Sequence, residues 1–384
     1  MKVLYRFFFA ALLLLSWAGC KDPQQDPCAS DYDQSALLQN VGENIIVPRY
    51  QNFSMRADEL YIAANDFTTQ SDAANLAALR EAWRAAYLSW QRVAMLEFGA
   101  AEADGGLRAM LNSYPTFSDR IEQTITAGDT SSIDLNTPFY QYARGFAALD
   151  YLLYGVASDE AGTLTKYTSD PQAAMRRFYL MKVADHLRTH AQRVYTAWRA
   201  DAGNYLLTFT TTTGVATGTS ISLLVNQLSA NFEEIKNNKL GTPLGAKVSY
   251  IAAPNKVEAF YSGISLDLAL EAVAASRDLF AGKHEHGTTD GQGLDDYLNA
   301  VEAARDEAPA TLLSADILAQ LERCRTTLED TRALGTLSQA ITADINAVKP
   351  AYAAAVNQIV LLKTDLPSLL CVSITYSDMT DDGD

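Results

Sequence analysis

The sequence predicts an all-α protein built from two helical bundles side by side, with few or no strands. Apolar residues recur at helical spacing over nearly the whole chain after residue 35. Runs rich in Ala, Leu, Glu and Arg, which favour helices, alternate with short turns that contain Gly, Pro and Asp. The one β-like stretch, residues 207–219, is short and rich in threonine, so we expect an exposed loop or a small hairpin there.

The first bundle is expected over residues 35–160. Its clearest helix, at 71–99, has an apolar face made by Trp83, Tyr87, Trp90 and Ala94, which are four, three and four residues apart. We expect this aromatic stripe to pack into the core. A second helix should begin at Pro138, because Thr137 suits an N-cap and proline suits the first helical position, and it should end near Gly155.

The second bundle is expected over residues 161–384. Helices are predicted at 170–205, 220–239 and 255–280, followed by two long Ala/Leu-rich helices within 314–366 that break near Gly335. A loop rich in Gly, His and Asp, residues 283–293, precedes the last pair.

Residues 1–19 predict a signal peptide. Lys2 and Arg6 form a basic head, and the apolar run after them, residues 7–15, is too short to span a bilayer as a stable helix. The sequence Ser-Trp-Ala-Gly then leads to Cys20, the pattern that a lipoprotein signal peptidase needs beside a lipidated cysteine. We therefore expect residues 20–34 to be a lipidated cysteine and a flexible tether. The alternative is a plain signal peptide cut nearby.

The chain is strongly acidic. Its formal net charge is −16, and loss of the signal peptide, which carries two basic and no acidic residues, makes it −18. Such a charge disfavours nucleic acid and anionic membrane surfaces as partners, so we expect contact with the membrane through the lipid.

Three cysteines remain if Cys20 is lipidated: Cys28, Cys324 and Cys371. One disulfide can form in an oxidising compartment, most simply between the two ends of the chain, and at least one thiol would stay free.

The most informative segment is residues 145–155, Gly-Phe-Ala-Ala-Leu-Asp-Tyr-Leu-Leu-Tyr-Gly. It resembles the signature of the imelysin family, Gly-x-His-x-x-Glu followed by an aromatic and leucine run and a glycine. Other segments resemble further parts of the family's sequence, and they occur in order along this one chain. They are Trp83 and Trp90 with residues 97–99, then residues 112–115, 232–245 and 257–266. The resemblance implies an all-α fold of two four-helix-like bundles, in a family that includes a secreted metallopeptidase and components of iron-uptake systems.

The sequence departs from that signature where a metal would bind. Ala147 stands at the histidine and Asp150 at the glutamate, the two proposed metal ligands of the family, while Gly145 is kept. Alanine has no lone pair to donate, so a site of imidazole plus carboxylate would keep only Asp150. The departure puts zinc-dependent peptidase activity in doubt.

Asp150 is the one acid of an apolar helix, so its burial requires a partner. It is either a remnant metal ligand or substrate contact, or half of a structural ion pair with an arginine or lysine of a neighbouring helix.

Three further residues share one face of the predicted helix 255–280. Glu258, Ser262 and Ser265 are four and three residues apart, and the family resemblance implies that this face looks toward a cleft. Alternatively, Glu258 forms a capping box with Asn255. Glu97, at the end of the first long helix, either faces the same cleft or is solvated.

The four histidines do not form a recognisable metal motif. His186 and His190 are four apart without the glutamate of His-Glu-x-x-His, and His284 and His286 flank Glu285 in a loop. We expect neither pair to be a built metal site. A nucleophile elbow and a P-loop are absent from the sequence.

The sequence favours a binding or accessory lipoprotein of iron, or other divalent metal, acquisition over an enzyme. It would hold an ion, a chelate or an uptake-system protein in the cleft. The alternatives are an imelysin-type metallopeptidase and a cell-surface interaction protein that has lost its site. We expect the protein at the outer membrane, on its periplasmic face or at the cell surface, and Lys21-Asp22 resembles the surface-export tags of Bacteroidetes lipoproteins.

Overall fold

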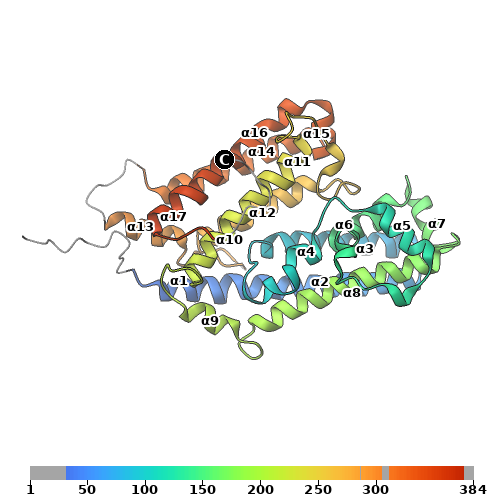
Figure 1. Ribbon diagram of the computed structural model, residues 1–384, viewed down its shortest axis with the longest axis horizontal. Coiled ribbons are helices and arrows are strands. Elements are labelled where there is room, and N and C mark those ends of the chain that lie inside the picture. The colour runs from blue at the N-terminus through green and yellow to red at the C-terminus, as the bar shows by residue number, and fades with distance from the viewer. Residues whose placement is uncertain (1–31, 286, 305–310, 376–384) are drawn as a thin grey trace, which may run out of the picture. The chain divides into compact units, whose positions relative to one another are not determined.

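The computed structural model describes residues 32–285, 287–304 and 311–375, and regular structure within these ranges is helical (Figure 1). The predicted all-α class is confirmed, because extended pairing among the described residues amounts to an isolated bridge between Lys283 and Asp290. None of the described helices is both long enough and apolar enough to cross a membrane. The predicted signal peptide and Cys20 lie outside the described residues.

The helices follow one another with short connections. The α-helices up to residue 198 are α1 (Gln34–Asn40), α2 (Val47–Thr69), α3 (Ala73–Val93), α4 (Leu107–Leu111), α5 (Ser118–Ala127), α6 (Gly145–Asp150), α7 (Glu160–Thr168) and α8 (Ala173–Trp198). Those that follow are α9 (Tyr205–Thr211), α10 (Ser220–Glu234), α11 (Thr242–Leu244), α12 (Ser265–Phe280), α13 (Leu294–Ala303), α14 (Leu313–Arg332), α15 (Leu337–Ala343), α16 (Ile345–Val360) and α17 (Leu366–Leu370).

Within the described ranges, four segments are π-helical: η1 (Val41–Ile46), η5 (Tyr151–Gly155), η6 (Ile235–Gly241) and η8 (Leu361–Asp365). The 3₁₀ turns are η2 (Gly99–Gly105), η3 (Thr130–Ser132), η4 (Pro138–Ala143) and η7 (Pro254–Lys256). π-Helical turns are rare in proteins, and those that occur often lie at functional sites. The segments η5, which follows Asp150, and η6 are therefore candidates for a functional role.

Helix α2 packs against both α3 and α8 (Figure 1), and aromatic side chains fill the core beside it. The stripe predicted on α3 is buried, as expected. The ring of Phe146 on α6 stacks on Tyr87 at 4.3 Å between centroids, and it lies 6.3 Å from Trp90, which also meets Phe53 of α2 at 5.7 Å. Large aromatic side chains of this kind dominate core energetics.

A second set of helices, α12, α14 and α16, packs together, and α12 also packs against α3. The division of the chain into bundles at residue 160 stays a prediction. Helix α8 lies after residue 160 in the chain, and it packs against α2, which lies before that residue.

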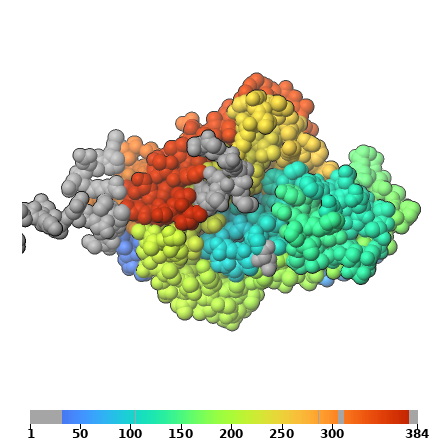
Figure 2. All heavy atoms as spheres, viewed as in Figure 1, coloured from blue at the N-terminus to red at the C-terminus, as the bar shows by residue number. Residues whose placement is uncertain are grey.

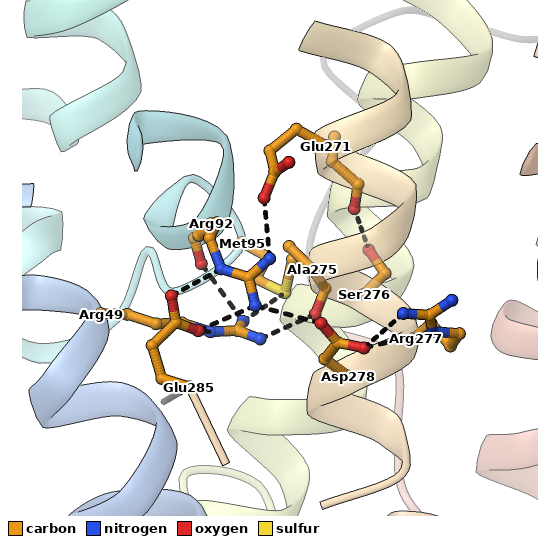
Figure 3. Close-up of polar contacts among 10 residues, drawn as sticks. Arg49, Arg92, Met95, Glu271, Ala275, Ser276, Arg277, Asp278 and Glu285 are labelled. Carbon is orange, nitrogen blue, oxygen red and sulfur yellow. Dashed lines mark hydrogen bonds and ion pairs between the residues drawn. The ribbon is translucent and has the colours of Figure 1, made fainter. Parts of the chain in front are cut away.

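A cluster of charged side chains links α2 and α3 to α12 and the loop after it (Figure 3). Glu285 bonds two guanidinium groups, those of Arg49 at 2.9 Å and Arg92 at 2.6 Å. Arg92 also reaches Glu271 at 2.7 Å and Asp278 at 3.1 Å. Burial, with the nearby charge of Arg92, lowers the pKa of Arg49 to about 10. Glu285, from the His-Glu-His loop, is therefore committed to structure.

The predicted helix 255–280 is wrong at its start, since α12 begins only at Ser265. The preceding residues form a 3₁₀ turn and then a stretch in which Ala259 and Gly263 have φ of 51° and 77°. Such left-handed residues interrupt an α-helix. No local pattern of apolar residues reveals this turn, because distant contacts of Glu258 hold it.

The predicted helix from Pro138 to residue 154 is also broken. A 3₁₀ turn ends at Ala143, and α6 starts anew at Gly145, whose φ is +70°. A Cβ atom at Gly145 would lie 2.1 Å from the carbonyl oxygen of Leu111, so only glycine fits this close approach.

Residues 207–211 of the β-like stretch belong to helix α9 (Tyr205–Thr211), which corrects the loop or hairpin expected there. Tyr205 and Phe209, four residues apart, both contact the ring of Trp198, at 5.0 and 5.5 Å between centroids. This packing at helical spacing overrides the β propensity of the threonines. The break near Gly335 is confirmed, with φ of 116° between α14 and α15.

In the described residues, the cysteines agree with the prediction of one disulfide and at least one free thiol. Cys371 is disulfide-bonded, and Cys324 is a free thiol buried in α14. Cys20 and Cys28 lie outside the described residues.

Candidate functional site

Asp150 ends α6 with its side chain 2% exposed. Its carboxylate accepts hydrogen bonds from the backbone N–H groups of Tyr261 at 2.9 Å and Ser262 at 3.0 Å. Burial raises the pKa of Asp150 to about 6, although the Ser262 hydroxyl and these amides favour the charged form. The expected arginine or lysine partner is thus replaced, in the described part of the chain, by backbone amides, and Asp150 fixes the turn before α12.

Glu258 lies in that turn and is 1% exposed. Its carboxylate forms an ion pair with Lys239 of η6. The other carboxylate oxygen accepts hydrogen bonds from Tyr87 at 3.1 Å, Gln91 at 3.2 Å and Asn112 at 2.8 Å. Lys239 donates as well to the Gln91 side-chain oxygen at 2.9 Å. A buried network satisfied in this way specifies one packing of the segments that contribute to it.

The prediction that Glu258, Ser262 and Ser265 share one face of a helix is wrong, although the three residues lie near one another. The Ser262 amide bonds Asp150, and the Ser265 hydroxyl donates to the carbonyl oxygen of Glu258. The capping box with Asn255 is wrong, because Asn255 lies inside the 3₁₀ turn η7, no α-helix starts there among the described residues, and the Glu258 carboxylate is used elsewhere.

A cavity of about 510 Å³ adjoins the network, with Asn112 in its wall. Its walls come from the region around α4, from residues 141–142 and from α10 and η6. Its polar uncharged lining consists of Asn112, Ser113, Tyr114, Gln141, Tyr142, Gln227, Asn237, Asn238 and Thr242. Its charged lining consists of Glu97, Glu233, Glu234, Arg108 and Lys256. The cavity is therefore rich in oxygen acceptors and amide donors.

The carboxylates of the cavity already have cationic partners. Arg108 lies between Glu97 at 3.8 Å and Glu234 at 3.4 Å, and the Tyr114 hydroxyl donates to Glu234 at 3.1 Å. Burial opposes the charge of Arg108, but Glu234 and Glu97 outweigh it and raise its pKa. Burial, aided by Glu234, raises the pKa of Tyr114 well above its usual value. The predicted cleft residue Glu97 thus lines the cavity as part of this charged group.

Glu233 is also paired, with Lys236 at 2.8 Å and Lys363 of η8 at 3.2 Å. With these pairs in place, the cavity presents a balanced polar surface rather than a set of unpaired carboxylates.

The catalytic metal of a metallopeptidase does not fit these residues. Ala147 is buried in α6 without a donor atom, and both oxygens of Asp150 accept backbone hydrogen bonds. In the part of the chain that the structure describes, no three or more His, Cys, Asp or Glu side chains are grouped to hold an ion. Gly145 contributes its conformation rather than a ligand.

His186 and His190 face each other on α8, with their Nε2 atoms 3.2 Å apart. Arg193 can only donate to Nδ1 of His190, at 3.4 Å, so Nε2 of His190 carries the proton and donates to His186. Burial, aided by His190, lowers the pKa of His186 to about 3. The two imidazoles thus form a hydrogen-bonded pair on one face of α8.

The model of the imelysin peptidase family matches residues 46–366. This chain belongs to the imelysin family. Iron-regulated protein A from Synechococcus elongatus is 25% identical over 264 residues, which are 66% of this chain and 66% of that protein.

Two solved structures share the imelysin fold of this chain. The first, assigned as an iron-regulated protein A precursor of Parabacteroides distasonis, has a TM-score of 0.71 at 18% identity and covers 89% of this chain and 96% of its own. An imelysin-like protein from Psychrobacter arcticus has a TM-score of 0.65 at 19% identity, over 91% and 99% of the two chains.

Sequence reasoning missed most of the residues that surround this candidate site. Lys239 and Arg108 were not singled out, nor were Gln91 and the η6 amides Asn237 and Asn238. A signal did exist in the run Glu-Glu-Ile-Lys-Asn-Asn-Lys at 233–239, which is unusually polar for a helix with so little exposed surface.

Proposed function

We propose that this protein is an exported, lipid-anchored binding protein of iron acquisition that holds an iron chelate in the 510 Å³ cavity. The names of two relatives support the link to iron, since both are iron-regulated protein A. The observation that carries the choice of ligand is the lining of the cavity: many amides and hydroxyls, with carboxylates that are already paired.

A chelate suits that lining better than a bare ion does. A bare ferric or ferrous ion needs several unpaired oxygen or nitrogen donors at short distance. The carboxylates of Glu234 and Glu233 would have to give up Arg108 and Lys236 to supply them. A chelate brings its own donors and presents oxygen atoms that the amides and Arg108 can bond, as polar groups in ligand pockets do.

The location is proposed from the sequence. Residues 1–19 supply the export signal and Cys20 the lipid anchor, with the outer membrane as destination. An uptake-system protein is the partner that would receive the ligand.

The experiment uses residues 20–384 with Cys20→Ser, so that no lipid is attached. Calorimetric titrations with ferric citrate, Fe²⁺, Fe³⁺ and Zn²⁺ are compared for this protein, for Arg108→Gln in the cavity and for Arg56→Gln, at an exposed arginine paired with Glu59 on α2. We expect saturable binding of ferric citrate that Arg108→Gln weakens at least tenfold, because it removes a guanidinium group that bonds the chelate oxygens, and that Arg56→Gln leaves unchanged.

Two other outcomes would replace this proposal. Tight binding of a bare ion that is lost in a folded Asp150→Ala variant would restore a metal site at the motif. If none of the four probes binds, a cell-surface interaction protein that has lost its ligand site would be the better description.

A further inference from the structure

A second cavity, of about 350 Å³, is lined by the loop of residues 245–253 and is called the loop cavity. It adjoins the first cavity, that of 510 Å³, because Asn237, Thr242 and Lys256 line both. Both volumes fall within the roughly 300–1,000 Å³ of pockets that hold small molecules. The loop cavity is therefore large enough to hold one part of a ligand whose other part lies in the first cavity.

The two adjoining cavities differ in chemistry. The first is lined mostly by amides, hydroxyls and charged groups. The described walls of the loop cavity are mostly glycine, alanine and branched aliphatic residues, namely Gly241, Ala246, Val248, Ile251, Ala252 and Ala253. A hydrocarbon group placed against such walls leaves water, and it also covers the apolar surface of the loop. A chelate with polar groups alone would occupy the first cavity and leave these walls in water.

The loop exposes its two largest aliphatic side chains. Ile251 is 71% exposed and Val248 is 56% exposed. Yellow, the colour of this part of the chain, reaches the outer surface in Figure 2. Backbone hydrogen bonds hold the loop closed, since the N–H groups of Val248 and Tyr250 both donate to the carbonyl oxygen of Gly245, at 2.9 and 2.8 Å. The apolar wall is thus formed and within reach before a ligand binds.

We propose that the iron chelate held by this protein carries an apolar arm, which extends past Lys256 into the loop cavity and packs against Val248 and Ile251. The inference rests on the proposed function and names the class of its ligand. Small-molecule sites combine apolar walls with a few polar groups that fix the orientation of the ligand, and the two adjoining cavities supply one of these each. A hydrocarbon without a chelating head would leave the polar groups of the first cavity unused.

The probes are ferric complexes of two monoamides of citric acid that differ only in the alkyl group. The methylamide has no arm, and the octylamide has a flexible apolar arm. Each complex is titrated by calorimetry, below its micelle concentration, into residues 20–384 with Cys20→Ser, beside ferric citrate itself. Burial of one CH₂ group corresponds to roughly fourfold in affinity, so an arm that buries two of them already gives a gain of more than tenfold.

Two variants, Ile251→Asp and Val248→Asp, each place a charge on the apolar wall. Neither residue is among those that line the first cavity. The matched control is Ile62→Asp, at an isoleucine that is 57% exposed on α2. We expect the octylamide complex to bind at least tenfold more tightly than the methylamide complex. Each loop variant should abolish this gain without changing the affinity for the methylamide complex, and Ile62→Asp should preserve it.

The proposal is overturned if the two amide complexes bind equally well, if the gain persists in both loop variants, or if Ile62→Asp abolishes it as well. Thermal unfolding of each variant shows that it is folded, which the high exposure of the three replaced side chains makes the expected result. Binding of ferric citrate and of the methylamide complex, without a gain from the octyl arm, would overturn this inference alone. If no ferric complex binds, the proposed function is wrong, and the inference is wrong with it.

Discussion

Replacement of Asp150 by asparagine should remove a pH dependence of stability that the buried carboxylate creates. The pKa of Asp150 is raised from 3.8 to about 6 in the folded protein, first of all by burial. Between these two values the folded state binds more protons than the unfolded state, so the free energy of unfolding falls as pH rises. The stabilisation is fully present below 3.8 and is lost as pH passes through 6.

A shift of about two units corresponds to about 3 kcal/mol at 1.36 kcal/mol per unit. Asparagine has nearly the same shape and cannot ionise. The stability of Asp150→Asn relative to the unmutated protein should therefore increase by about 2 kcal/mol between pH 4 and pH 7.5, since pH 4 already lies slightly above the unfolded pKa.

Urea unfolding of the two proteins, followed by tryptophan fluorescence at intervals across this pH range, measures the difference. The pKa of Asp295 is also raised to about 6, by burial and by Asp296, but Asp295 is present in both proteins and cancels. Parallel stability profiles would refute the reasoning, because they would mean that the amides of residues 261 and 262 hold Asp150 ionised at its ordinary pKa.

Two further substitutions and one thiol reaction test single contacts. Glu285→Ala leaves the two arginines of Figure 3 without their shared carboxylate and should lower the free energy of unfolding in urea by about 3–5 kcal/mol. Glu59→Ala, in an exposed pair, should lower it by about 1 kcal/mol or less, and equal losses would contradict a buried network. Gly145→Ala places a Cβ atom against a backbone carbonyl and should prevent folding or cost several kcal/mol of stability. Gly128→Ala, at the same φ of +70° but with open space around it, should cost about 1–2 kcal/mol by thermal unfolding, and an equally small loss for Gly145→Ala would contradict the close approach. The Cys324 thiol, whose pKa burial raises to about 12, should react with a thiol reagent only as fast as the protein unfolds, and rapid reaction at neutral pH would show that it is accessible.

The fold class could be predicted from the sequence because helices carry a local signal. The spacing of Trp83, Tyr87 and Trp90 records the buried face of α3 directly. Gly145 could likewise be singled out, since a signature glycine needs a conformation that other residues avoid.

The candidate site could be predicted only in part, because its contacts join distant segments. Glu258 pairs with Lys239, 19 residues away, and with Tyr87, 171 residues away, and no periodic pattern encodes either contact. The same contacts explain why α12 starts late. Asp150 was recognised as a buried acid, but its partners are backbone amides, which leave no trace in residue identity.

The most direct test of the account is the calorimetric titration of ferric citrate into residues 20–384 carrying Cys20→Ser, beside the same protein with Arg108→Gln. The account predicts a saturable site that is weakened at least tenfold by this one change in the cavity wall, with little response to bare Fe³⁺. Equal affinity in both proteins would place the ligand outside the cavity, and no binding of the chelate would contradict the proposed function.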